Sequence, residues 1–127
     1  MLDTQKMART IAAVSPTRTI VLLVEANSDA RSRHESLLAS AGYSVLCVAS
    51  FPDASEVQSA AVVIADVAWF YWFQAQQFDR TPPILVVADD LKEGITACLC
   101  GADDWIPLDG EPAYMLGTVL EALSSSR

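Results

Sequence analysis

The chain has 127 residues, 52% of which are hydrophobic, and its formal net charge is −8. This length predicts one domain of roughly 100–200 residues, and the apolar content excludes intrinsic disorder for most of the chain. A chain with this negative charge would repel phosphate backbones, which disfavours direct nucleic-acid binding. No apolar run reaches the roughly 20 residues of a membrane span.

Residues 1–18 form the first expected segment, an N-terminal extension. It carries Lys6 and Arg9 beside a short apolar run at residues 11–14, which lacks the length and the flanks of a secretory signal. Pro16 ends any helical turn in this segment. A loosely docked extension is the favoured interpretation, and a docking arm is the alternative.

Residues 19–124 are predicted to form the domain, with residues 125–127 as a tail or linker. Continuous apolar runs, typical of strands buried on both faces, occupy residues 19–24, 44–49, 61–66, 84–88 and about 105–106. Helical patterns follow these runs, at about residues 28–41, 52–59, 68–79, 90–100 and from 111 onwards. Strands that alternate with helices pair in parallel, and right-handed crossovers place helices on both faces of the sheet. The predicted fold is therefore α/β, a doubly wound (βα)5 sheet of five parallel strands with flavodoxin-like architecture.

Asp66 ends the third apolar run and is expected at the carboxyl end of a buried parallel strand. In an open α/β sheet, that edge is where ligands bind and where chemistry takes place. A carboxylate in this position can accept a phosphoryl group when a metal ion and cationic or hydroxyl partners lie nearby. Asp66 is therefore the first candidate site residue.

Four segments resemble the receiver domain of two-component response regulators, over about residues 19–124. Residues 24–27 are similar to the acidic loop after the family's first strand, and residues 39–43 are similar to the end of its first helix. Residues 62–66 resemble the strand that ends in the phosphoacceptor, and residues 101–107 resemble the run into the fifth strand. The resemblance implies the receiver architecture, with Asp66 as the phosphoacceptor, Glu25 and Asp66 as ligands of Mg²⁺, and Trp105 as the switch aromatic.

The sequence departs from the family pattern at the positions that handle the phosphoryl group. Ala26 replaces the second acid of the metal-binding pair, Ala88 replaces the hydroxyl residue after the fourth strand, and Leu108-Asp109 replaces the Lys-Pro pair after the fifth strand. Residues 67–69 replace the usual Met-Pro loop. A phosphoryl group on Asp66 would face Ala88 and Leu108, neither of which can pair with it. Both the transfer and the readout of a phosphoryl group are therefore expected to fail.

The predicted function is that of an atypical receiver domain, a pseudo-receiver that acts in signal transduction through protein–protein contact without aspartyl phosphorylation. It is not expected to be an enzyme, and no cofactor is expected beyond weakly held Mg²⁺. The expected partners are a histidine kinase, an output domain or another regulator, and a homodimer is left open. The first alternative is a slow but genuine phosphoacceptor at Asp66 in a phosphorelay. The second is a small-ligand sensor that uses an aromatic-lined edge of the sheet.

Residues 69–73 are all aromatic. A helix cannot turn five successive side chains inward, because neighbouring side chains are about 100° apart. If the buried stripe is Tyr71, Trp72, Ala75 and Phe78, some of the other aromatic side chains are exposed. The predicted interaction site is therefore Trp69, Phe70, Trp72 and Phe73. The alternatives are that this segment folds over the carboxyl edge and fills the degenerate site, or that partners contact the face of the fourth helix, fifth strand and final helix.

The three cysteines, Cys47, Cys98 and Cys100, form no even-numbered disulfide framework, which is typical of a reducing cytoplasm. Cys98 and Cys100 are two positions apart on an expected helix and do not share a face, so they are interpreted as buried small side chains rather than metal ligands. His34 lies among charged residues of the first helix of the domain and is interpreted as part of a solvated face.

Overall fold

Five parallel strands form a single sheet in the computed structural model, which describes residues 19–76 and 81–125. The strands are β1 (Ile20–Val24), β2 (Ser44–Val48), β3 (Val62–Asp66), β4 (Ile84–Ala88) and β5 (Asp104–Pro107), and they lie in the order β2-β1-β3-β4-β5. The predicted α/β fold with a doubly wound, five-stranded parallel sheet is confirmed. The predicted extension at residues 1–18 lies outside the described part of the chain.

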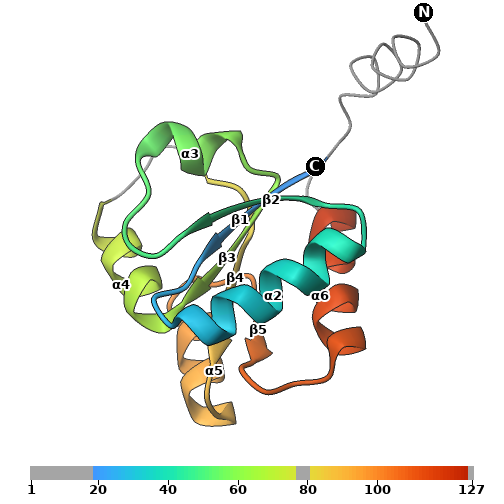
Figure 1. Cartoon of the computed structure of the whole chain (residues 1–127). Coiled ribbons are helices and arrows are strands. Elements are labelled where there is room, and N and C mark those ends of the chain that lie inside the picture. The colour runs from blue at the N-terminus through green and yellow to red at the C-terminus, as the bar shows by residue number, and fades with distance from the viewer. Residues whose placement is uncertain (1–18, 77–80, 126–127) are drawn as a thin grey trace, which may run out of the picture.

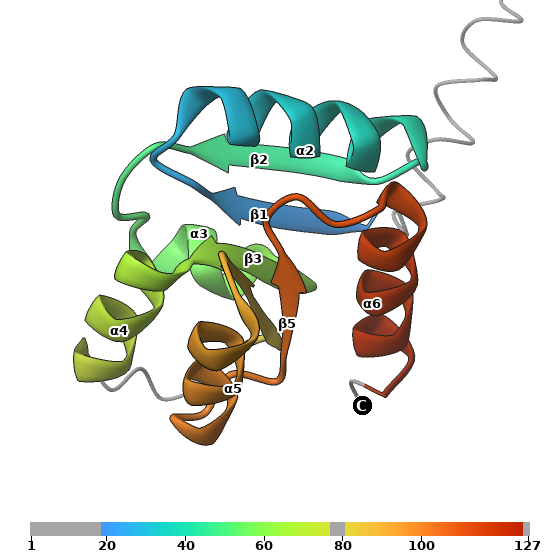
Figure 2. The same ribbon diagram turned by 90° about the horizontal axis from the view of Figure 1, so that it is seen from below.

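Helices cover both faces of the sheet. In the described ranges they are α2 (Ser28–Ser40), α3 (Ala54–Ser59), α4 (Val67–Gln76), α5 (Leu91–Leu99) and α6 (Pro112–Ser125). Helices α2 and α6 lie on one face, and α3, α4 and α5 lie on the other (Figure 1, Figure 2). None of the described helices is long and apolar enough to cross a bilayer.

The strands divide their side chains between two hydrophobic cores, one on each face. On β1, Leu22 and Val24 pack toward α3, α4 and α5, whereas Val21 and Leu23 pack toward α2 and α6. This alternation follows from the period of two along a strand. Because both faces are covered, the strand sequences are continuous apolar runs instead of alternating ones. Within the strands, the polar side chains of Ser44, Asp66 and Asp104 therefore stand at the ends.

Side-chain caps start the helices that follow β1 and β4. The Asn27 side chain accepts the N–H of Ala30, and the Asp90 side chain accepts the N–H of Glu93. Such caps satisfy N–H groups that have no partner within the helix. They also tie the loops at the carboxyl ends of these strands to the first turns of α2 and α5, next to the candidate site.

Candidate functional site

The candidate site lies at the carboxyl edge of the sheet, where β1 and β3 are neighbours. Val24 pairs in register with Ala65, so the next residues, Glu25 and Asp66, lie side by side at this edge. In a parallel sheet, the loops after all the strands meet at this edge. The structure thus brings together the two acids that the sequence predicts for this site, together with the ends of β4 and β5.

Asp66 uses both of its carboxylate oxygens in hydrogen bonds to the backbone. Oδ1 accepts the N–H of Trp69 at 2.9 Å, and Oδ2 accepts the N–H of Ala26 at 3.0 Å. Trp69 is the third residue of α4, so the first bond is that of an N-cap. Helix α4 begins at Val67, directly after the strand, in place of the loop that follows the phosphoacceptor in the family. Asp66 therefore joins the loop after β1 to the start of α4.

Glu25 is buried and paired with a histidine. Its Oε1 lies 2.7 Å from Nδ1 of His34, and only 2% of Glu25 and 5% of His34 are exposed. The interpretation of His34 as part of a solvated face is wrong. Helix α2 turns this residue inward, on the same face as Ala30 and Leu38, because the three positions are spaced by four. The pair places the imidazole ring of His34 next to Glu25, one of the two predicted metal ligands.

The predicted Mg²⁺ ligands, Glu25 and Asp66, do not fit the ion in this arrangement. Mg²⁺ requires near-octahedral oxygen ligands and keeps several waters. Glu25 is enclosed and hydrogen-bonded to His34, and both oxygens of Asp66 already accept N–H groups. Across the described ranges, no group of three or more Asp, Glu, His and Cys side chains is arranged to hold a metal ion.

Two arginines of α2, which the sequence analysis does not single out, reach the loops of this edge. Nη1 of Arg31 donates to the carbonyl of Glu25 at 2.7 Å. Nη2 of Arg33 donates to the carbonyl of Leu108 at 3.1 Å and lies 3.7 Å from Oδ1 of Asp109. Leu108 stands at the position of the family's lysine. Arg33 of α2 therefore brings a positive charge close to this position. Sequence spacing cannot reveal such contacts, because Arg33 and Leu108 are far apart along the chain.

The ends of β4 and β5 carry the other two predicted positions. Ala88 is buried at the end of β4 and pairs in register with Pro107. Trp105, the predicted switch aromatic, is half-buried and packs against α5 at Gly94, where an added Cβ would overlap the indole ring. Gly94 thus permits the close approach of helix and ring. The switching role of Trp105 stays a prediction.

The predicted exposure of Trp69, Phe70 and Phe73 is wrong. Trp69, Phe70 and Phe73 are 2%, 0% and 3% exposed, and they pack in the core on the α4 side of the sheet. Because α4 begins at Val67, positions 69, 70 and 73 face the sheet, and Tyr71 and Ala75, expected inside, are exposed. Phe78 lies outside the described residues. A partner cannot reach the three buried rings, so they do not form an interaction surface.

Aromatic stacking explains how this segment is held. Trp69 stacks on Phe73 with ring centroids 4.7 Å apart, and the half-buried Trp72 stacks on Phe51 at 4.4 Å. Offset aromatic pairs of this kind add to the energy of burial. The indole Nε1 of Trp69 is the one buried side-chain N or O atom in the described ranges that has no hydrogen-bond partner. The segment is therefore mainly a structural element beneath the candidate site.

The cysteines differ in their surroundings. Burial raises the pKa of the Cys47 thiol to about 11, and the neighbouring carboxylate of Glu35 adds to the rise. Cys98 is half-buried, and burial also raises its pKa. Cys100 is exposed, so the expectation that it is buried is wrong. The structure places no disulfide among the three.

The sequence matches no protein-family model and no curated protein. Solved structures are similar in fold. The chemotaxis response regulator CheY4 of Vibrio cholerae is 27% identical, with a TM-score of 0.65, and the match covers 83% of this chain and 98% of that chain. A putative response regulator from Chloroflexus aurantiacus is 24% identical, with a TM-score of 0.73, covering 84% and 98%. A response regulator receiver protein from Burkholderia phymatum is 22% identical, with a TM-score of 0.71, covering 84% and 95%.

These similarities agree with the order of the strands and with the helices on both faces of the sheet. They extend over most of this chain and nearly all of each similar structure. The resemblance that the sequence predicts is thus supported at the level of the whole fold. The chain has the receiver-domain fold of two-component response regulators, a fold that supports a role in signal transduction.

Proposed function

We propose that the chain is an atypical receiver domain that signals through protein contact, without control by phosphorylation of Asp66. The proposal rests above all on the two hydrogen bonds of the Asp66 carboxylate, to the N–H groups of Ala26 and Trp69. A phosphoryl group on either oxygen would displace one of these donors. Modification would then weaken either the start of α4 or the link to the loop after β1.

The surroundings of Asp66 also argue against efficient phosphoryl transfer. The reaction depends on a metal ion and on donors that neutralise the charge of the transferred group. Ala88 and Leu108 offer no side-chain donor at the two family positions, and Glu25 is committed to His34. In enzymes, removing a single preorganised donor lowers the rate on the order of 100- to 1,000-fold. The arrangement therefore favours a signalling module over a phosphoacceptor.

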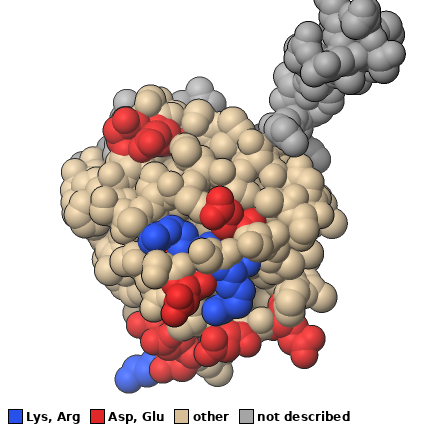
Figure 3. Space-filling view, in the orientation of Figure 1, with Lys and Arg blue, Asp and Glu red and all other residues tan. Residues whose placement is uncertain are grey.

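Helix α5 offers the surface for contact. Leu91, Ile95 and Leu99 are 63%, 46% and 82% exposed, and their spacing by four residues puts them on one face. Acidic side chains gather at the lower end of the molecule in Figure 3, where Figure 1 places α5. An apolar stripe on the helix at this acidic end of the molecule suits a protein partner with a basic, amphipathic surface. Two copies of such an acidic face would repel each other, which disfavours a homodimer through α5.

The test of phosphorylation is intact mass after long incubation with acetyl phosphate and Mg²⁺. We expect no phosphoryl adduct on the wild-type chain. The alternative function, slow phosphorylation in a phosphorelay, draws on the position of Asp66 at the end of β3. An adduct on wild type that is absent from Asp66→Asn would establish that alternative and contradict the proposal.

The test of the contact surface compares two exposed leucines. Leu99→Ser removes the most exposed member of the α5 stripe, and Leu120→Ser removes a leucine of α6 that is 60% exposed. A partner that copurifies quantitatively with wild type and with Leu120→Ser, but not with Leu99→Ser, is the expected result. Equal recovery with both variants would contradict a contact through α5.

A further inference from the structure

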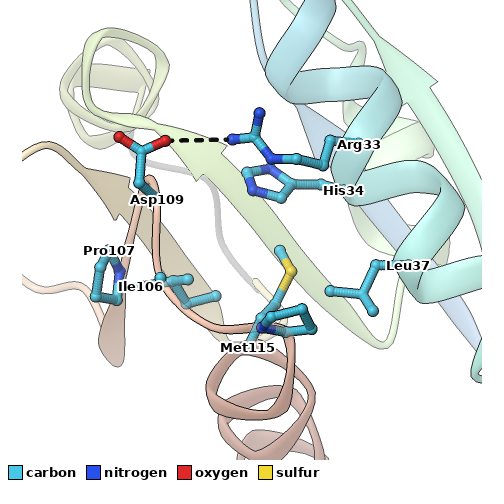
Figure 4. Close-up of a pocket in the computed structure, with 9 residues that line it drawn as sticks. Arg33, His34, Leu37, Ile106, Pro107, Asp109 and Met115 are labelled. Atoms are coloured by element: carbon cyan, nitrogen blue, oxygen red, sulfur yellow. Dashed lines mark ion pairs between the residues drawn. The ribbon is translucent and has the colours of Figure 1, made fainter.

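A cavity of about 370 Å³ lies between α2, the loop after β5 and the start of α6 (Figure 4). Small-molecule sites have volumes of roughly 300–1,000 Å³, with apolar walls and a few polar groups that converge. The walls here follow that pattern, with polar and apolar side chains that include Arg33, His34, Asp109, Leu37, Ile106 and Met115. The cavity is distinct from the aromatic segment, whose rings at positions 69, 70 and 73 are buried.

His34 presents one ring nitrogen to this cavity. Its Nδ1 lies 2.7 Å from Oε1 of the buried Glu25, and Nδ1 is the donor of this bond when Glu25 is ionised. Nε2 has no hydrogen-bond partner among the described residues, and it is not an enclosed atom. His34 is 5% exposed and lines the cavity, so it keeps one unpaired ring nitrogen there.

Arg33 adds a cation at the rim of the same cavity. Figure 4 shows Arg33 and His34 projecting from α2 toward the loop that carries Asp109. Only Nη2 of the guanidinium contacts Leu108 and Asp109, so its other nitrogens are available. The ion pair with Asp109 is long, at 3.7 Å, and Asp109 is 90% exposed, so solvent screens it strongly. A better-placed carboxylate can take the place of Asp109.

We infer that this cavity binds a small organic carboxylate. Arg33 holds the carboxylate, because a guanidinium fork matches its two oxygens. Nε2 of His34 adds a second donor in the imidazolium form, in which Nδ1 stays bonded to Glu25. Leu37, Ile106 and Met115 contact the apolar body of the ligand. The inference is independent of how Asp66 or α5 takes part in signalling.

Binding at this cavity has a route to the carboxyl edge of the sheet. His34 bonds to Glu25, and the next residue, Ala26, donates its N–H to Asp66. A ligand that moves the imidazole ring therefore acts on the loop after β1. We expect the amide signal of Ala26 to report the binding, although Ala26 does not line the cavity.

The experiment is an NMR titration of the full chain with benzoate, and it follows the Met115 methyl and the Ala26 amide signals. Benzyl alcohol is the uncharged counterpart, and acetate is the carboxylate without an apolar body. We expect saturable shifts with benzoate in the millimolar range, weaker binding of acetate and no saturation with benzyl alcohol. Equal affinities for the three compounds, or no saturation with benzoate, would overturn the inference.

Three variants locate the carboxylate. Arg33→Gln is expected to weaken benzoate binding roughly tenfold, the effect of losing a charge-assisted hydrogen bond. Lys92→Gln makes the same change of charge on exposed α5, away from the cavity, and is expected to leave the affinity unchanged. Asp109→Asn is expected to raise the affinity by freeing Arg33. Equal losses in the Arg33 and Lys92 variants, or no gain in the Asp109 variant, would contradict the placement of the carboxylate.

Discussion

The carboxylate of Asp66 accepts the backbone N–H of Trp69 at 2.9 Å, so the last residue of β3 is the cap of the helix that follows it. The strand and the helix meet without an intervening loop. The second oxygen of Asp66 binds the N–H of Ala26 across the sheet edge. One side chain therefore fixes two connections, a role in stability that does not depend on phosphoryl chemistry.

Replacing Asp66 by alanine is expected to lower the free energy of unfolding by about 1–2 kcal/mol, the usual cost of losing a helix N-cap. Asp66→Asn is expected to cost less, because asparagine also caps helices well. Urea unfolding followed by circular dichroism measures both. Asp89→Ala is the control, since Asp89 is an exposed acid at the same edge. An equal loss in the Asp66→Ala and Asp89→Ala variants would contradict the capping role.

The buried pair of Glu25 and His34 is expected to show strong coupling. Removing one partner leaves the other buried without compensation, at a cost of about 3–5 kcal/mol. Glu25→Ala and His34→Ala are therefore each expected to be strongly destabilising, whereas the double variant is expected to lose much less than the sum. A double-mutant cycle by chemical denaturation measures this coupling. Additive losses would mean that the hydrogen bond between the two side chains contributes nothing.

Gly94 and Gly117 form a matched pair for testing the packing of Trp105. Both lie within helices, where glycine to alanine normally stabilises by roughly 0.5–1 kcal/mol. At Gly117 nothing lies within 4 Å of the added Cβ, so Gly117→Ala is expected to stabilise the chain. At Gly94 the Cβ would overlap the indole of Trp105, and Gly94→Ala is expected to destabilise by about 1–3 kcal/mol, the typical cost of overpacking.

Thermal unfolding and tryptophan fluorescence measure these two effects. The smaller side chain of Trp105→Leu is expected to relieve the loss caused by Gly94→Ala. If Gly94→Ala raises the stability as much as Gly117→Ala does, the ring does not press on α5 in solution.

Cysteine reactivity follows from the pKa values. The thiolate is the reactive form, so at pH 8 only about one Cys47 side chain in a thousand is reactive when its pKa is about 11. Iodoacetamide at pH 8 is therefore expected to modify the exposed Cys100 well before Cys47, as peptide mass spectrometry can follow. In urea all three cysteines are expected to react at similar rates. Equal rates for Cys47 and Cys100 in the folded chain would contradict the burial of Cys47.

The raised pKa of Cys47 also predicts how the stability of the fold changes with pH. The folded state favours the protonated thiol, so the contribution of Cys47 to stability is complete below its ordinary pKa of 9.0 and is lost as the pH rises toward 11. Stability measured between these two values is expected to fall less steeply in Cys47→Ala than in wild type.

The sequence by itself determined the strands, their parallel pairing and the position of Asp66 at the end of the third strand. A strand of a parallel sheet buried on both faces is a continuous apolar run, and the β-branched residues of 62–66 favour a strand over a helix. The absence of a hydroxyl residue at Ala88 and of a lysine at Leu108 is likewise a property of the sequence. These features predict a receiver fold with a degenerate phosphorylation site. The structure confirms the fold.

Tertiary structure alone decided which side chains face inward and what the polar groups contact. The phase of α4 depends on its first residue, Val67, and that phase buries Trp69, Phe70 and Phe73. The rotation of α2 about its axis brings His34 to Glu25. A polar residue can be buried when a hydrogen-bond partner compensates it. No local pattern in the sequence encodes that partner. Periodicity describes one element at a time, whereas a site is made where several elements meet.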